Sequence, residues 1–256
     1  MRNEPAPAHR YELKYTVTED QAAGIRDFIR PLFSLDGNVP SEQGSYTVNS
    51  VYMDTPGLRF YHDTRLRQLL RFKPRIRYYG TSEVDSLTLE VKYRHHRTVW
   101  KARQRIATAQ WPQVLGTTGS ELVSPRYGIL PESFVDVHHL YGTEPVLHLR
   151  YHREPFVSEV DTYGRITFDR AMRYRLLRGS HDILCRDGEL TYYDDAVTAQ
   201  WDESPVVLEI KTEALVPFWA LDLIKRFGLV QRGYSKYRYV IDHCLERAGS
   251  GDDIAF

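Results

Sequence analysis

The sequence has few cysteines and no long apolar run. Only two of its 256 residues are cysteine, Cys185 and Cys244. They form no CxxC or other metal-binding spacing, so we interpret both as ordinary thiols, as a reducing compartment would allow. No apolar stretch approaches the ~20 residues of a membrane-spanning helix, and the polar start of the chain does not resemble a signal peptide. These absences predict a cytoplasmic protein that does not insert into a membrane, and they leave open a separate membrane partner.

The sequence also has no net charge, because 34 Lys and Arg residues balance 34 Asp and Glu residues. A balanced chain creates no overall field that would draw it to DNA or RNA. We therefore expect no nucleic-acid partner. Any anion-binding site must come from a local separation of charge.

What the sequence does contain is a series of short segments in which apolar and charged residues alternate. Side chains of a β-strand point alternately to its two faces, so each segment would have one apolar and one charged face. The charged residues are mostly Arg and Lys, which bind phosphate. A closed barrel of such strands could enclose a basic lumen, whereas the alternative is an exposed, charged β surface. The clearest segments are Arg10–Lys14, Arg75–Arg77, Leu89–Lys92, Arg165–Asp169 and Leu208–Lys211.

The pattern predicts one β-rich domain at residues 9–245, preceded by a flexible arm (1–8) and followed by a flexible tail (246–256). Thr18 and Gln21 fit a capping box that begins a helix ending near Pro31. Longer periodicity predicts short helices within 107–142 and a helix at about 216–228. Strands are expected at about 9–16, 45–54, 69–79, 86–94, 98–106, 145–153, 156–162, 164–170 and 205–212.

Seven motifs occur in an order that resembles the VTC (vacuolar transporter chaperone) domain. This domain is the polyphosphate-polymerase branch of the CYTH-like proteins, or triphosphate tunnel metalloenzymes. No motif is specific by itself, but together they cover about residues 9–243. They are Glu12-Leu13-Lys14, Arg75-Ile76-Arg77, Leu89-Glu90-Val91-Lys92, the run from Tyr151 to Phe156, Arg165–Asp169, Leu208-Glu209-Ile210-Lys211 and Ser235-Lys236-Tyr237.

The resemblance implies an α+β fold, in which an antiparallel eight-stranded β tunnel, closed as a barrel, is flanked by helices. It implies an enzyme that transfers the γ-phosphate of ATP to inorganic polyphosphate with Mn²⁺ or Mg²⁺. Glu209 would match the family's metal-binding carboxylate. The residues that would bind the triphosphate and the growing chain are Lys14, Arg75, Arg77, Lys92, Arg153, Arg165 and Lys236.

The alternation adds further candidates on the same charged faces. Arg10, Lys101, Arg103 and Lys211 are expected to bind substrate. The carboxylates Glu90 and Glu12 are either additional metal ligands or salt-bridge partners that hold the neighbouring cations extended.

Two positions depart from the family pattern. The hydrolytic relatives carry ExExK on the first strand, and Arg10 stands where the first Glu would be. The loss of a carboxylate favours polymerase over triphosphatase activity, and a non-catalytic polyanion-binding module is the third alternative. Arg153 has the strand parity of Leu147 and Leu149, so either the strand bulges or Arg150 is the lumen residue. We favour Arg153 for its place in the motif.

Overall fold

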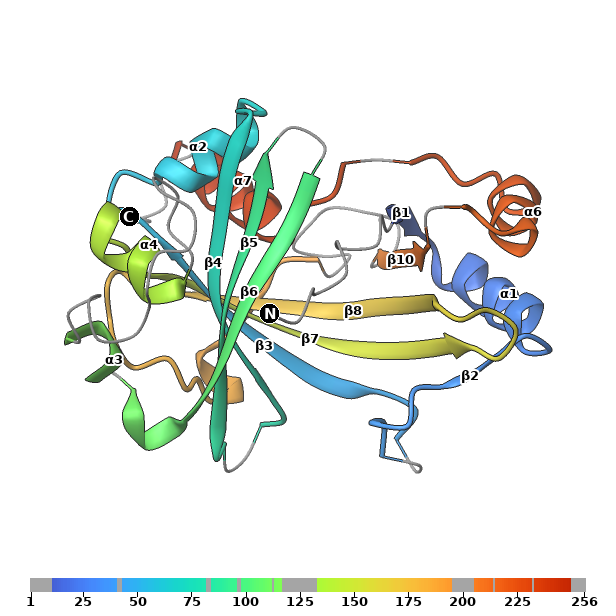
Figure 1. Cartoon of the computed structure of the whole chain (residues 1–256), viewed down its shortest axis with the longest axis horizontal. Helices are drawn as coiled ribbons and strands as arrows, with labels where there is room; N and C mark the ends of the chain where they lie inside the picture. The colour runs from blue at the N-terminus through green and yellow to red at the C-terminus, as the bar shows by residue number, and fades with distance from the viewer. Residues whose placement is uncertain are drawn as a thin grey trace, which may run out of the picture. The chain divides into compact units, whose positions relative to one another are not determined.

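The computed structural model groups the chain into two compact units that are built from interleaved segments (Figure 1). The first unit comprises residues 1–47, 151–172 and 192–234, and the second comprises 48–150, 173–191 and 235–256. The single domain expected at 9–245 stays a prediction. The structure describes residues 11–40, 43–81, 84–95, 98–111, 113–116, 133–194, 205–213, 215–231 and 233–249.

The first unit contains a sheet in which β1 (Tyr11–Val17) pairs antiparallel with β10 (Val206–Thr212), and β10 pairs antiparallel with β8 (Gly164–Leu176). The next strand is β7 (Glu144–Ser158), which also pairs with the short β2 (Phe33–Leu35). β7 and β8 each continue into the second unit.

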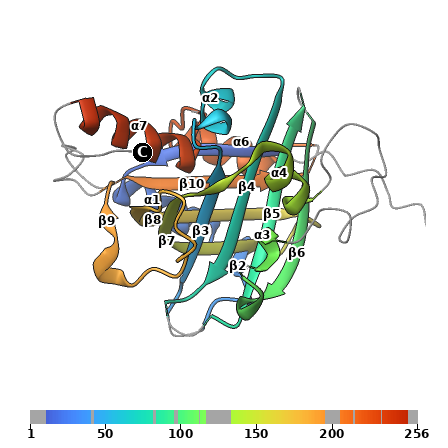
Figure 2. The same cartoon turned by 90° about the vertical axis from the view of Figure 1, so that its left-hand side faces the viewer.

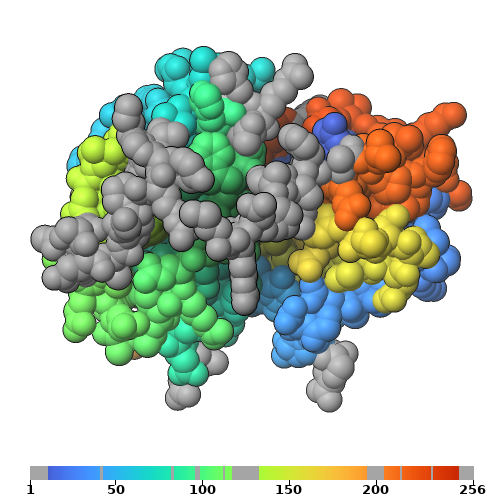
Figure 3. Space-filling view, in the orientation of Figure 1, coloured from blue at the N-terminus to red at the C-terminus, as the bar shows by residue number. Residues whose placement is uncertain are grey.

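Helices α1 (Glu19–Ile29) and α6 (Phe218–Arg226) cover one face of this sheet (Figure 1). The predicted capping box begins α1, with Gln21 N–H donating to Thr18 Oγ1 (3.0 Å) and Thr18 N–H donating to Gln21 Oε1 (3.1 Å). The opposite side of α6 lies at the surface (Figure 3), where Phe218 is 89% exposed. The core between helices and strands includes Tyr15, Val17, Ala22, Ile25, Ile29, Ile166, Phe168, Leu208, Ile210, Trp219, Ala220 and Leu223.

The second unit contains four strands that follow one another in the sheet, β3 (Tyr46–Asp54), β4 (Leu70–Tyr79), β5 (Ser86–His95) and β6 (Thr98–Ala107) (Figure 2). Their apolar faces pack against Phe60 of the helix at Arg59–Arg65 and against Phe134 of the helix at Phe134–Tyr141. Within its described residues, the helical elements of this unit are α2 (Arg59–Arg65), η1 (Thr108–Gln110), α3 (Gln113–Gly116), α4 (Phe134–Tyr141), η3 (Asp187–Glu189) and α7 (Lys236–Gly249). The two-residue strand β9 (Thr191–Tyr192) pairs with β8.

The structure corrects two predictions about the sheet. The main strands follow the order β1-β10-β8-β7-β3-β4-β5-β6, and within the described ranges no pairing joins β1 to β6. A closed barrel was therefore too strong a prediction, although the eight strands are present. The strands expected at 145–153 and 156–162 are one strand, β7, because Pro155 lies just before the residues that pair with β2 and its missing N–H breaks no bond of that ladder.

Helix α2 was not predicted, because its seven residues show no clear apolar period. Its first N–H groups are instead satisfied by side chains that precede the helix: Thr55 Oγ1 accepts from Arg59, and Asp54 accepts from Phe60 and Tyr61. Over the part of the chain that the structure describes, no helix is long and apolar enough to cross a bilayer.

Candidate functional site

The first unit carries a charged sheet face on which both signs occur, which we call the mixed face. Strand pairing forms cross-strand rows, since Lys14 lies opposite Glu209 and Glu209 lies opposite Thr167. The next row contains Glu12, Lys211 and Arg165. The apolar neighbours of these residues point into the core on the other side. The mixed face consists of Glu12, Lys14, Arg153, Arg165, Thr167, Asp169, Glu209 and Lys211.

Glu209 is the centre of the mixed face. It is only 4% exposed, and its carboxylate lies 2.8 Å from Lys14 Nζ and 2.7 Å from Lys211 Nζ. Glu12 approaches the same Lys14 ammonium at 3.2 Å. Burial by itself would lower the pKa of Lys14, but the two carboxylates outweigh burial and raise the pKa. Lys14 is therefore charged at any physiological pH and lies between two carboxylates.

Arg153 belongs to the mixed face as well. Its Nε and Nη2 donate to the two oxygens of Asp169 at 2.7 and 2.8 Å, and its Nη2 lies 3.8 Å from Glu209. Burial would lower the pKa of Arg153, but Asp169 raises it well above the ordinary value. Arg150 lies in the second unit, 1% exposed, where it donates to Asn49 and the Cys185 carbonyl. Arg150 also binds a carboxylate, Asp187, in that unit. Of the two arginines, Arg153 is therefore the one that reaches the carboxylates of the mixed face.

The second unit carries a sheet face with a large excess of positive charge, which we call the cationic face. In one cross-strand row, Lys73, Lys92 and Lys101 lie opposite one another. Three like charges in neighbouring positions repel one another unless an anion lies among them. The cationic face consists of Lys73, Arg75, Arg77, Thr88, Glu90, Lys92, Lys101, Arg103 and Arg105.

Glu90 is the single carboxylate of the cationic face, and two arginines bind it. Arg75 donates from Nε (2.7 Å) and lies at 2.6 Å through Nη2, and Arg103 Nε lies 2.9 Å from the other oxygen. Burial would raise the pKa of Glu90, but Arg75, Arg77 and Arg103 outweigh burial and lower the pKa to about 2. Of the two alternatives for Glu90, this geometry favours the salt-bridge partner, because both oxygens already bind guanidinium groups.

Two buried polar groups on neighbouring strands have no hydrogen-bond partner among the described residues. They are the Nε of Arg77 on β4 and the Oγ of Ser50, which lies opposite Arg77 on β3. Buried polar groups are usually satisfied, so these two indicate a place where a solvent molecule or a ligand supplies the partner. Arg77 was predicted as a site residue, and Ser50 was not.

The N-terminal end of α7 also reaches the cationic face. Lys73 Nζ donates to Ser235 Oγ at 2.9 Å, and Lys236, the first residue of α7, is 7% exposed. The sequence placed Lys73 and Asp169 on charged strand faces and Ser235 within a motif, but none of the three was predicted as a site residue. Their signals were weak but present, because Ser235 directly precedes a predicted site residue and Asp169 follows the alternation of β8.

The mixed face offers hard oxygen donors of the kind that Mn²⁺ and Mg²⁺ prefer. Glu12 and Glu209 converge on one positive charge, the Lys14 ammonium, so their arrangement accommodates a cation. The Thr167 hydroxyl in the same row is buried without a partner in the described structure. The described part of the chain contains no group of three or more His, Cys, Asp or Glu that could hold a metal alone. Glu12 and Glu209 therefore fit a divalent ion whose other ligands come from water or phosphate.

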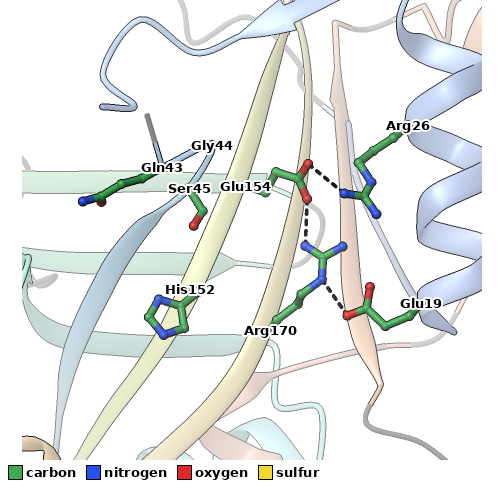
Figure 4. Close-up of a pocket in the computed structure, with 8 residues that line it drawn as sticks. All are labelled: Glu19, Arg26, Gln43, Gly44, Ser45, His152, Glu154 and Arg170. Carbon is green, nitrogen blue, oxygen red and sulfur yellow. Dashed lines mark hydrogen bonds and ion pairs between the residues drawn. The ribbon is translucent and has the colours of Figure 1, made fainter. Parts of the chain in front are cut away.

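The first unit also has a cavity of about 300 Å³ that contains none of the predicted site residues (Figure 4). Its charged groups bind one another: Arg170 donates to Glu19 (2.7 Å) and Glu154 (2.8 Å), and Arg26 lies 3.6 Å from Glu154. This network attaches α1 to β7 and β8, which is a structural role. The cavity is lined by Glu19, Arg26, Gln43, Gly44, Ser45, His152, Glu154 and Arg170.

Arg10, the proposed replacement for the first carboxylate of the hydrolytic relatives, lies outside the described residues. Arg165 and Lys211 lie in one row of the mixed face, where Arg165 is exposed and its guanidinium lies 5.8 Å from the Tyr163 ring. The structure therefore distributes the predicted site residues over two faces, one in each unit.

Comparison with known proteins identifies the family. Residues 9–243 match the family described as VTC domain. No curated protein matches the chain. The structure is similar to the PH1819 protein of Pyrococcus horikoshii OT3 (12% identity, 91% of this chain, 99% of that chain, TM-score 0.45). It is equally similar to a candidate adenylate cyclase from Vibrio parahaemolyticus (12% identity, 92% and 99% covered, TM-score 0.45). Because the match to the family covers most of the chain, this chain belongs to the VTC domain family.

Proposed function

We propose that this protein is a polyphosphate polymerase, which transfers the γ-phosphate of ATP to the end of an inorganic polyphosphate chain. One observation carries the proposal: the cationic face presents seven cations and a single carboxylate, Glu90. A surface with such an excess of charge favours a ligand with many closely spaced negative charges. The cations are Lys73, Arg75, Arg77, Lys92, Lys101, Arg103 and Arg105.

The cationic face would act mainly by positioning the phosphates and neutralising their charge. Phosphoryl transfer needs little covalent chemistry from the protein, because its transition state spreads charge over the phosphate oxygens. Arg75 would offer phosphate a fixed guanidinium, since Glu90 holds its orientation. Arg77, Lys92 and Lys236 would bind phosphate oxygens directly.

On the mixed face, Glu12 and Glu209 would hold the divalent ion. When bound, Mn²⁺ or Mg²⁺ would neutralise phosphate charge and polarise the bond to the transferred phosphoryl group. Lys14 and Lys211 would then turn from Glu209 toward phosphate. Arg153 would stay with Asp169, whose bidentate contact fixes the side chain.

A non-catalytic module that binds polyphosphate or another polyanion is the second candidate. The observation in its favour is that Glu90 and Glu209 are already bound by cations. A protein that only holds a polyanion needs no carboxylate available for a metal.

One assay separates the candidates. Purified protein is incubated with ATP and Mn²⁺, and polyphosphate and free phosphate are both followed over time. Chain growth supports the polymerase, and phosphate release without chain growth would support a triphosphatase instead. Tight binding of polyphosphate with neither product supports the binding module. The variant Arg77→Ala/Lys92→Ala, assayed in parallel, shows whether any activity belongs to this protein rather than to a contaminant.

A further inference from the structure

At the end of β3, Asp54 is completely buried and binds the start of a neighbouring helix. Its carboxylate accepts N–H groups from Thr55 (2.7 Å), Phe60 (2.9 Å) and Tyr61 (2.9 Å). Three backbone donors hold the carboxylate in one orientation and compensate for much of the cost of its burial. Asp54 is therefore a fixed acceptor inside the second unit.

Tyr237, in the first turn of α7, attaches that helix to this acceptor. Its hydroxyl donates to Asp54 Oδ2 at 2.7 Å, and its ring stacks on Tyr52 with 4.9 Å between the ring centroids. The side chain is 3% exposed. Tyr52 lies opposite Arg75 in the pairing of β3 with β4, so this contact lies beside a row of the cationic face.

The neighbours of Tyr237 in the sequence are site residues. Ser235 accepts the hydrogen bond from Lys73, and Lys236 begins α7. Successive side chains on an α-helix point about 100° apart. When Tyr237 is fixed to Asp54, the direction of Lys236 is fixed as well.

We propose that Tyr237 is a positioning residue, which holds Lys236 toward phosphate bound on the cationic face through its hydrogen bond to Asp54. This inference rests on the proposed function, because Lys236 is useful in this direction only if the face binds a phosphate chain. Tyr237 itself does not contact the substrate.

Tyr61 provides a matched control within the same unit. It is also buried, and its hydroxyl also donates to a carboxylate that involves α7, Asp242, at 2.7 Å. Asp242 lies more than one turn further along the helix than Lys236, and Arg238 binds it as well. Loss of the Tyr61 hydroxyl should loosen the attachment of α7 without changing the direction of its first residue.

The test measures the affinity for inorganic tripolyphosphate by titration calorimetry in Tyr237→Phe, Tyr61→Phe, Lys236→Ala and the double variant Tyr237→Phe/Lys236→Ala. Tyr237→Phe should weaken binding about tenfold, as expected when a contact with a charged ligand is misaligned. Tyr61→Phe should stay within about twofold of wild type. In the Lys236→Ala background, Tyr237→Phe should have no further effect, because the residue through which it acts is gone.

The proposal is overturned if Tyr237→Phe binds like wild type, if Tyr61→Phe weakens binding equally, or if the Tyr237 effect persists without Lys236. In those cases the proposed function stands, since wild type still binds. If wild type does not bind tripolyphosphate, the proposed function fails, and the positioning role fails with it. Should Tyr237→Phe not fold at the assay temperature, the titrations of all four variants and of wild type are repeated at a lower temperature at which Tyr237→Phe is folded.

Discussion

The mixed face of the first unit and the cationic face of the second arise from the same alternation of side chains, yet they differ in how their charges are compensated. On the mixed face, three carboxylates accompany four cations. Glu209 binds Lys14 and Lys211, and Asp169 binds Arg153. On the cationic face, Glu90 is the single carboxylate among seven cations.

The difference in charge compensation indicates that one face mainly stabilises the fold and the other mainly binds an anion. Buried cations that are paired within the protein contribute to folding and resist replacement, because breaking a buried pair leaves an uncompensated charge. An excess of cations over carboxylates on one face instead lowers the stability of the fold, because like charges repel one another, and it favours the binding of an anion. We therefore expect variants of the paired residues to change stability or metal dependence, and variants of the excess cations of the cationic face to change activity.

The largest effect is expected for Arg77→Ala on the cationic face. Removing a cation that stabilises the transferred phosphoryl group should lower polyphosphate synthesis about 100- to 1,000-fold. The melting temperature should fall only slightly, because Arg77 stabilises the charge of Glu90 but Arg75 and Arg103 still bind that carboxylate. Arg30→Ala, which removes an exposed arginine from the end of α1, is the control and should keep full activity. An equal loss in both variants would contradict a specific role for the face.

The next effect is expected for Asp169→Asn on the mixed face. The substitution leaves the Arg153 guanidinium buried without its bidentate partner, which should lower the free energy of unfolding by about 3 kcal/mol. Urea denaturation followed by circular dichroism measures the change. Asp27→Asn breaks the exposed pair with Arg30 and should leave the midpoint unchanged. If Asp169→Asn is as stable as wild type, the mixed face is not held together by its internal pairs.

Glu90→Gln tests the one carboxylate of the cationic face through its pH dependence. The folded-state pKa of Glu90, about 2, lies below the ordinary 4.5, so its contribution to stability is present above pH 4.5 and is lost as the pH falls toward 2. We expect Glu90→Gln to lower the free energy of unfolding by about 2 kcal/mol at pH 7. Below pH 4.5 the difference from wild type should shrink in urea titrations. A difference that stays constant down to pH 3 would show that the ionised carboxylate is not what stabilises the fold.

The smallest effect is expected on the Mn²⁺ requirement, which tests most directly whether the two faces have separate roles. Glu209→Gln should raise the Mn²⁺ concentration for half-maximal activity by about tenfold or more, as the loss of an oxygen ligand weakens a metal site. Nucleotide binding should be retained in part. Glu90→Gln should leave the Mn²⁺ requirement unchanged, since its carboxylate serves Arg75 and Arg103. An equal shift in both variants, or none in Glu209→Gln, would remove the division between the faces.

Local features of the structure were predictable from the sequence. The period of two in β4 and β5 indicated which residues share a face, because side-chain direction in a strand depends only on position along it. The capping box of Thr18 and Gln21 marked the start of α1, since its hydrogen bonds connect residues three apart. One wrong prediction also came from a local signal. Pro155 suggested that the strand ends there, but the pairing of β7 with β2 begins at Phe156 and does not need the missing N–H of Pro155.

The pairing of charges was decided by the tertiary structure. The sequence places Glu90, Glu209 and Asp169 on charged faces, but only strand register determines that Glu90 meets Arg75 and that Asp169 meets Arg153. Contacts such as Tyr237 with Asp54 join residues 183 positions apart, and no local pattern encodes their partner. The sequence by itself thus determined where charge lies on each strand, because that follows from local periodicity. Only folding decided which charges are neutralised within the protein and which remain in excess, because neutralisation depends on the register of neighbouring strands.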